Sequence, residues 1–312
     1  MRTLSLSLLP ISILASGAQA AHAQSPMTED PQEVVVTAMR AGVPVWRVRS
    51  PTGTLVLVGS IDNVAAGTEW RPAALAETVS RAHRVMFPQM VSVNVSPFAL
   101  VGYYAKWKRR ERLPRGQSLA SMLSGADYER LRRLAAQGSA PADFHRWHPL
   151  HLSFNMQDRL RKRTGLMEEA TATVARASAK YKVARVPLER TSARPLTENL
   201  FRSQPAEHLP CLRATIAAVE GGPEGLRARS RDWAGKRVQA ALAAPSQHMG
   251  ASCWPRNANP LNQTSLVNTI RRTLAGQGTT LAVVNLEALA RGGGLLDVLT
   301  AAGFQVTGPA WR

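Results

Sequence analysis

The stretch Thr54-Leu55-Val56-Leu57-Val58-Gly59-Ser60-Ile61-Asp62 decides the fold of this chain. Its apolar first half predicts a buried strand, and the Gly-Ser-Ile-Asp half predicts a turn at the end of that strand. A second β-rich run, Val45–Arg49, lies upstream across Ser50-Pro51-Thr52-Gly53, a combination typical of a hairpin turn. We therefore expect a β-hairpin whose second strand ends close to Asp62.

Strands alternate with helical patterns along the rest of the chain. A helical pattern begins at Pro72 and is followed by the apolar run Val85–Phe87. Further helices are expected at residues 128–136, 144–160, 167–181, 207–220, 225–242, 264–275 and 295–302, and further strands at 183–188, 280–284 and 304–306. This alternation predicts an α/β fold, with α+β as the alternative, built on a central mixed sheet flanked by helices. No Ser/Gly/Pro-rich linker separates two cores, so we expect one domain at residues 43–312 with a helical insertion at about 98–180.

The N-terminus has the features of an export signal. Arg2 is followed by the apolar run Leu4–Leu14 and by two small-x-small sites that end at Ala20 and Ala23. The run is shorter than the ~20 residues that span a bilayer, and an uncleaved anchor is the alternative. We expect residues 1–23 to be a signal peptide and the mature protein to be periplasmic or secreted. Residues 24–42 are expected to be a flexible linker, within which 34–37 could pair as an edge strand.

The chain is strongly basic, with 39 Lys and Arg against 21 Asp and Glu and a formal net charge of +18. Removing residues 1–23 takes away only the charge of Arg2, which leaves 18 − 1 = +17. Such a charge favours anionic partners, namely acidic polysaccharide, lipopolysaccharide or an anionic membrane surface. Nucleic acid is the least favoured partner for an exported protein. Part of the charge reflects arginine used in place of lysine on ordinary surfaces.

The densest basic segment is the candidate binding surface. It comprises Lys106, Trp107, Lys108, Arg109, Arg110, Arg112 and Arg115. Tyr103 and Tyr104 precede it, and aromatic rings beside cations can stack on sugars or lie at a membrane surface. The alternative is an ordinary solvated helix face.

Cys211 and Cys253 are the two cysteines of the chain. An exported protein meets an oxidising compartment, so we predict that they form a disulfide. Closing this loop would stabilise the fold by about 4 kcal/mol on the chain-entropy model. Two buried free thiols are the alternative.

His145, His148 and His151 follow one another at a spacing of three residues, which places them on one face of a helix. Three histidines at this spacing could bind zinc. Pro149 interrupts the run, however, and favours surface histidines near a kink.

Several motifs, taken in their order along the chain, resemble the TraB/GumN family, whose Tiki-type members are metal-dependent hydrolases. The resemblance rests on Val45-Trp46-Arg47-Val48, Gly59-Ser60-Ile61-Asp62, Trp70-Arg71-Pro72, Val183–Thr191 and Asn262–Val306. It implies a hydrolase scaffold over most of the mature chain.

The resemblance also implies where the metal-binding residues of the family would fall. The first Gly-x-x-His places its histidine at Asp62, and the second, matched by Asn285-Leu286-Glu287-Ala288, places its histidine at Ala288. The glutamate after the next strand falls near Pro88-Gln89, where no carboxylate is present, whereas the Gly-Leu-Glu segment retains Glu189. An Arg-Asn pair before a late helix falls on Asn262-Gln263. Both histidines of the family are therefore replaced.

These replacements separate two possible functions. A hydrolytic metal needs several fixed ligands and an open position for water, and Ala288 has no lone pair to offer. We therefore expect a catalytically inactive, exported protein that acts by binding at the cell envelope, without a cofactor. The alternative is a metal-dependent peptidase or hydrolase in which Asp62, Glu189 and Glu287 form an oxygen-rich site for manganese, magnesium or zinc.

Overall fold

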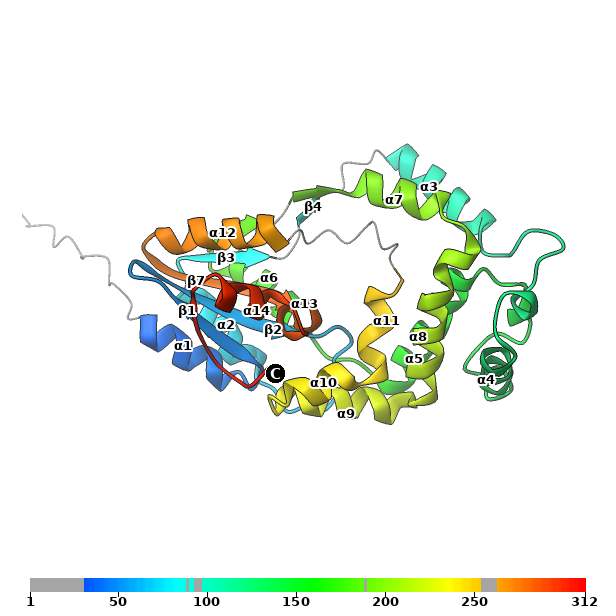
Figure 1. Ribbon diagram of the computed structural model, residues 1–312, viewed down its shortest axis with the longest axis horizontal. Coiled ribbons are helices and arrows are strands. Elements are labelled where there is room, and N and C mark those ends of the chain that lie inside the picture. The colour runs from blue at the N-terminus through cyan, green and yellow to red at the C-terminus, as the bar shows by residue number, and fades with distance from the viewer. Residues whose placement is uncertain (1–30, 88–89, 93–96, 188–189, 254–262) are drawn as a thin grey trace, which may run out of the picture.

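A computed structural model describes residues 31–87, 90–92, 97–187, 190–253 and 263–312, so the expected signal peptide lies outside the described residues. At the centre is a six-stranded sheet with the order β5-β3-β7-β2-β1-β8 (Figure 1). Its strands are β1 (Val45–Arg49), β2 (Gly53–Ser60), β3 (Arg84–Phe87), β5 (Ala184–Pro187), β7 (Gly278–Asn285) and β8 (Gln305–Thr307). β1 pairs antiparallel with β2 and β8, whereas β2, β7, β3 and β5 are parallel. The α/β fold with a mixed sheet is thus confirmed.

β2 and β7 form the middle of the sheet because both of their faces are apolar. Residues 54–60 and 279–284 are all buried, as expected for parallel strands that are covered by helices on both sides. Gly59 allows Trp46 of β1 to pack closely against β2. A Cβ atom at Gly59 would lie 2.8 Å from a methyl carbon of Leu286 and 3.0 Å from the Trp46 ring. A side chain at this position would therefore push the strand away from its neighbours.

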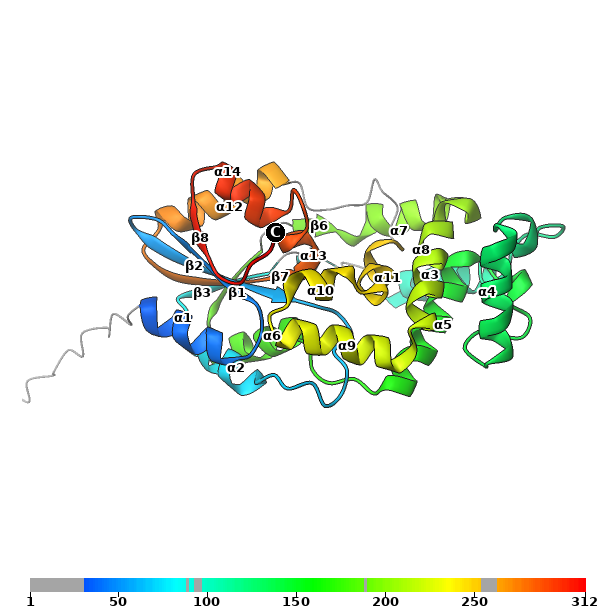
Figure 2. The same cartoon turned by 60° about the horizontal axis from the view of Figure 1, so that its bottom comes forward.

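Helices cover both faces of the sheet (Figure 2). One layer contains α1 (Pro31–Arg40), α2 (Pro72–Ser80) and α6 (Ala170–Lys180), and the other contains α12 (Gln263–Ala275) and α14 (Leu295–Ala301). The two layers and the sheet enclose one hydrophobic core, which includes Leu75, Val174, Ile270 and Leu299.

Residues 31–40 form a helix rather than the flexible linker or edge strand expected from the sequence. Val34, Val35 and Ala38 lie on one face of α1 and are at most 4% exposed, as members of the sheet core. Burial of this face is a tertiary interaction, which outweighs the β propensity of consecutive valines.

A second core lies in a helical lobe, which two separate parts of the chain build together. Its helices are α3 (Pro97–Arg109), α4 (Gly125–Ala136), α5 (Pro149–Thr164), α7 (Ala193–Arg202), α8 (Leu209–Glu220), α9 (Gly222–Ala234) and α11 (His248–Ala251), with 3-10 turns at Leu119–Ser121, Phe144–Arg146, Pro205–His208 and Pro245–Gln247. The single insertion expected at 98–180 therefore has different limits. α6 and α10 (Val238–Ala243) pack in the sheet core, while the core of the lobe draws on residues within 113–160 and 212–226 and on Met249.

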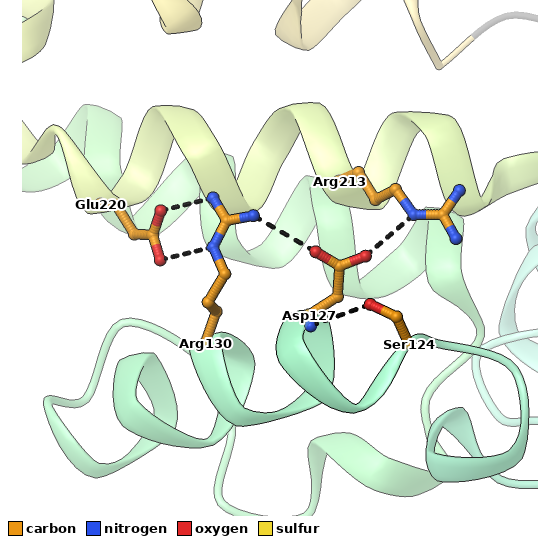
Figure 3. A network of polar contacts seen from close by, with 5 residues as sticks. All are labelled: Ser124, Asp127, Arg130, Arg213 and Glu220. Atoms are coloured by element: carbon orange, nitrogen blue, oxygen red, sulfur yellow. Dashed lines mark hydrogen bonds and ion pairs between the residues drawn. The ribbon is translucent and has the colours of Figure 1, made fainter.

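The outermost helix of the lobe, α4, is held to α8 by a network of charged side chains (Figure 3). Arg130 donates to both carboxylate oxygens of Glu220, at 2.9 and 2.5 Å, and to Asp127 at 3.2 Å. Arg213 donates to the same aspartate at 3.0 Å, and Ser124 accepts from the backbone N–H of Asp127 at 3.1 Å. A connected, partly buried network of this kind stabilises a contact more than isolated surface pairs do.

A small parallel sheet leads from the central sheet to α3 and α7. β4 (Met90–Ser92) pairs with β6 (Arg190–Ser192); α3 follows β4 in the chain and α7 follows β6. α3 and α7 come to lie together at the outer side of the molecule (Figure 1). Within the described ranges, no helix is long and apolar enough to cross a bilayer.

Candidate functional site

The carboxyl ends of parallel strands bring the motif positions together at one edge of the sheet. Ser60 at the end of β2 pairs with Asn285 at the end of β7. Asp62 lies two residues after Ser60 and Glu287 two residues after Asn285, so both follow the same edge of the sheet. This edge is where α/β folds usually bind ligands. Glu189, the third candidate, follows β5 in the chain and lies outside the described residues.

Glu287 has a partner other than Asp62. Asn285 accepts a hydrogen bond from the Glu287 backbone N–H at 2.9 Å, which starts helix α13 (Leu286–Ala290) immediately after the strand. The Glu287 side chain is 18% exposed, and its Oε1 lies 3.6 Å from Nδ1 of His248. Ala288 is the next residue of α13 and carries no donor atom. The second motif, Asn285-Leu286-Glu287-Ala288, therefore contributes the Glu287 carboxylate, which lies beside His248.

Asp62 has a buried arginine beside it. Its side chain is exposed, but its carbonyl oxygen accepts a hydrogen bond from Arg229 of α9, which is 2% exposed. Arg229 also donates to the carbonyl of Ser246 at 2.8 Å. Burial lowers the pKa of Arg229 to about 10, while the nearby carboxylates of Asp62 and Glu169 raise it. At that pKa the guanidinium is charged at neutral pH.

Glu169 completes this charge cluster. Its Oε1 accepts a hydrogen bond from the backbone N–H of Asn63 at 2.5 Å. Burial raises the pKa of Glu169; the bond from Asn63 lowers it, the charge of Asp62 raises it, and the charge of Arg229 lowers it. One guanidinium is therefore positioned to neutralise two carboxylates at the end of β2.

Helix α9 holds the whole connection that follows β2. Besides Arg229, Ser230 accepts from the backbone N–H of Ala65 at 3.0 Å, and Trp233 donates to the carbonyl of Gly59 at 2.7 Å. Arg229 and Glu169 are not among the site residues predicted from the sequence. The signal for Arg229 was its spacing from Leu226 and Trp233, which puts a charged residue on the buried face of an amphipathic helix.

The candidate metal ligands are only partly within the described residues, because Glu189 lies outside them. No three His, Cys, Asp or Glu side chains within the described ranges are grouped so that they could hold one ion. The buried guanidinium of Arg229 is bonded to the backbone carbonyl of Asp62, and its charge also acts on the carboxylates of Asp62 and Glu169. Asp62 and Glu287 do lie on the same edge, yet each is engaged separately.

The basic segment lines a pocket of about 480 Å³ between α3 and α7. The pocket is lined by Tyr103, Lys106, Arg109, Arg110, Glu198, Phe201 and Arg202. Tyr103 stacks on Phe201 with ring centroids 5.9 Å apart, and the Lys106 ammonium lies 5.9 Å from the centroid of Tyr103. The pocket thus combines two aromatic rings with four cationic side chains and one carboxylate. Arg202 comes from a distant segment of the chain and was not among the basic residues predicted from the sequence.

Four members of the predicted basic segment have structural partners, namely Arg110, Arg112, Lys108 and Trp107. Arg110 donates to the carbonyls of Leu200, Phe201 and Ser203 at the end of α7, and burial lowers its pKa. Arg112 pairs with Asp143 at 2.6 Å, and Lys108 pairs with Glu111 at 3.3 Å. The Trp107 ring packs 3.9 Å from the ring of His151, and Arg115 is exposed away from the pocket. Lys106, Arg109 and Arg110 are thus the members that the pocket brings together.

Histidines of the lobe lie behind α3, and two of the three expected at the surface are buried. His148 caps α5 by accepting from the Leu150 N–H at 3.3 Å, and it contacts His151 and His208, with ring centroids 5.8 and 5.4 Å apart. His148 and His151 are only 4% and 7% exposed, whereas His145 is exposed as expected. Burial lowers the pKa of His148 to about 3 and that of His151 to about 4.

The predicted disulfide is confirmed and lies beside these histidines. Cys211 and Cys253 are bonded, with their Cα atoms 4.4 Å apart. They form a small apolar cluster with Leu150, against which Trp107 and Leu200 pack. The disulfide therefore supports the helices that carry the pocket.

Comparison with known proteins supports the resemblance found in the sequence. The model of the TraB/PrgY/gumN family matches residues 44–308, which covers the sheet, its flanking helices and the helical lobe. Neither the search of curated proteins nor that of solved structures gave a significant match.

Proposed function

The chain belongs to the TraB/PrgY/gumN family, and from this premise we propose that it is an exported protein that binds anionic ligands and does not act as a metal-dependent hydrolase. The ligand class is an anionic polysaccharide, lipopolysaccharide or a membrane surface. The place of action is the periplasm or the outside of the cell, because residues 1–23 have the pattern of a signal peptide.

The pocket between α3 and α7 is the observation that carries this proposal. Lys106, Arg109 and Arg202 place their charges around aromatic walls, and Glu198 is the carboxylate that opposes them. Arg202 lies 3.8 Å from Glu198, which is too long for a tight pair and leaves the pocket with an excess of positive charge. An anionic ligand would find both charge and stacking surfaces there.

The sheet edge supports the part of the proposal that concerns catalysis. Arg229 is a buried cation bonded to the backbone carbonyl of Asp62, beside the first motif position, and Ala288 at the second motif position supplies no ligand. A guanidinium cannot bind and activate a water molecule as a Lewis acid does. The retained scaffold is therefore expected to serve as a support for the helical lobe.

Retention on dextran sulfate tests the binding function. In a K106S/R109S/R202S variant we expect retention to fall about ten- to hundredfold, since each cation near an anionic surface contributes about 1 kcal/mol. The matched control is R71S/R271S/R291S, which removes the same charge from exposed positions elsewhere. Equal losses in both variants would mean that net charge alone acts, and unchanged retention in the first would exclude the pocket.

Metal content and turnover test the other half of the proposal. Protein purified without chelator should hold less than stoichiometric manganese, zinc or magnesium, and should show no peptidase or esterase activity when manganese, cobalt or zinc is added. The contrary result is one metal per chain together with turnover that E189Q, D62N or E287Q abolishes. That result would establish the hydrolase alternative, with a site completed by residues outside the described ranges.

A further inference from the structure

Helix α3 has two opposite faces with different partners. Tyr103, Trp107 and Arg110 follow the spacing i, i+4, i+7, and all three contact the molecule, through Phe201, through His151 and through the carbonyls that end α7. This inner face fixes the helix to the lobe. The outer face carries the exposed ion pair of Lys108 with Glu111, at 3.3 Å, and leaves Val101 and Tyr104 exposed.

The outer face presents apolar side chains to solvent. Val101 and Tyr104, spaced i and i+3, are 68% and 63% exposed, more than any other large hydrophobic side chain of the described residues whose burial is known. Lys108 continues the same face one turn further, and its side chain is 54% exposed. Exposed apolar side chains that adjoin each other on a rigid helix mark an interaction surface more often than scattered ones do.

Charge decides what this surface fits. Lys108 lies on the same face as the apolar pair and Arg109 lies between this face and the pocket, whereas Lys106 points to the Tyr103 ring on the inner side. A polysaccharide could use the cations and stack on Tyr104, but it would gain nothing from an exposed valine. An anionic bilayer uses all of them, because phosphates bind the cations, tyrosine favours the interface, and a valine enters the acyl region.

We propose that the outer face of α3 docks this protein on anionic phospholipid bilayers. Val101 and Tyr104 enter the interface, while Lys108 and Arg109 contact lipid phosphates. This inference rests on the proposed anionic binding function and names its partner as a membrane surface. It describes peripheral binding, since no described helix could span the bilayer.

Vesicle co-sedimentation tests the inference with the full mature chain. The probes are phosphatidylcholine vesicles with and without phosphatidylglycerol. A V101S/Y104S variant should bind the anionic vesicles about tenfold more weakly than wild type, because two apolar side chains no longer leave water. The matched control, L166S/Y181S, exchanges one aliphatic side chain and one tyrosine that are 41% and 43% exposed elsewhere, and should bind like wild type.

Dextran sulfate retention, measured on the same variants, separates the two proposals. V101S/Y104S should be retained as strongly as wild type and should unfold in urea as wild type does, whereas K106S/R109S/R202S should lose retention more than vesicle binding. If V101S/Y104S binds vesicles as wild type does, the membrane inference is wrong. If wild type is retained on dextran sulfate but does not bind vesicles, a polysaccharide is the partner. If wild type binds neither probe, the proposed function fails as well.

Discussion

Arg229 occupies a position on α9 where an amphipathic helix normally carries an apolar side chain. Leu226 and Trp233, at spacings of three and four residues from it, are fully buried. Burying a cation is costly unless hydrogen bonds and nearby opposite charges compensate. Here two carbonyls accept from Arg229 and the charges of Asp62 and Glu169 raise its pKa, while its Nε is buried without a hydrogen-bond partner. Removing the guanidinium should therefore cost more free energy of unfolding than its hydrogen bonds contribute, because the two carbonyls would be left without this donor and the carboxylates without the charge of Arg229.

Replacing Arg229 with methionine tests this role. The R229M side chain has similar length but cannot donate to Asp62 or Ser246, so we expect the free energy of unfolding to fall by about 3 kcal/mol. Urea unfolding measures the change. The control is R231M on the same helix, where an exposed pair with Glu224 is removed and less than about 1 kcal/mol should be lost. If E169Q restores none of the loss in R229M, Glu169 is not part of the cluster.

The buried histidines predict an acid-sensitive fold. Burial first, then the charges of His208, His151 and Arg110, lower the pKa of His148 from 6.5 to about 3. Burial also lowers the pKa of His151 to about 4, although Glu111 opposes the shift. Below pH 6.5 the unfolded chain takes up these protons and the folded chain does not. The stability that the neutral histidines contribute is therefore lost as pH falls from about 6.5 towards 4.

Two titrating histidines should make the free energy of unfolding fall by up to about 2–3 kcal/mol per pH unit within that window. The variant H148N/H151F should flatten this part of the profile, because asparagine can keep the cap on α5 and phenylalanine can keep the contact with Trp107. Equilibrium unfolding between pH 7 and pH 4 measures the slopes. H145N, which alters an exposed histidine, should leave the profile of wild type unchanged.

At the scale of elements, local patterns predicted most of the sheet. The hairpin of β1 and β2, the strand β7 and the helices α12 and α14 follow from periodicity and turn residues within a few positions of one another. The helix expected at 144–160 instead begins at Pro149, with a 3-10 turn before it. The helix expected at 225–242 is divided after Gly235, where Lys236 has a φ of 60°. Proline and a left-handed residue break helices whose apolar pattern continues.

The candidate sites depend on contacts that no local pattern contains. Asp62 and Glu287 were found because a family resemblance identified both positions, and parallel pairing then brought them to one edge. Arg229 reaches Asp62 from 167 residues away, and Arg110 reaches Phe201 from 91 residues away. Arg202 joins the pocket in the same manner. Such pairings follow from the packing of the lobe, which the sequence alone did not define.

The disulfide joins Cys211, in the first turn of α8, to Cys253, which lies just after α11 and 42 residues further along the chain. A C211A/C253A variant should lose about 4 kcal/mol of unfolding free energy, because the unfolded chain regains the entropy of an open loop. Thermal or urea unfolding with and without reductant measures the loss. Reductant should destabilise wild type by a similar amount and leave the variant unchanged; a variant as stable as wild type would contradict this role.

At the scale of the whole molecule, helix α9 contributes side chains to both hydrophobic cores. α9 contributes Leu226 to the lobe and Trp233 to the sheet core, and Trp70 packs against Trp233 with ring centroids 5.4 Å apart. The lobe carries the basic pocket, and the sheet side carries the edge with Arg229. Loss of Arg229 should therefore weaken packing at the sheet edge, and loss of the disulfide should weaken packing in the helical lobe.

Export links the disulfide, the charge and the N-terminal segment. A mature chain of charge 18 − 1 = +17 that begins after Ala20 or Ala23 would meet an oxidising compartment, where Cys211 and Cys253 can pair. We expect the full chain, produced in a bacterium with two membranes, to be found outside the cytosol, to start at residue 21 or 24, and to contain no alkylatable thiol. N-terminal sequencing and mass spectrometry after denaturation without reductant measure this. The matched control begins at residue 24 behind an initiator methionine; it should stay in the cytosol, keep two thiols and match the stability of C211A/C253A. A full chain that starts at Met1, remains cytosolic and has two free thiols would show that the segment is no export signal.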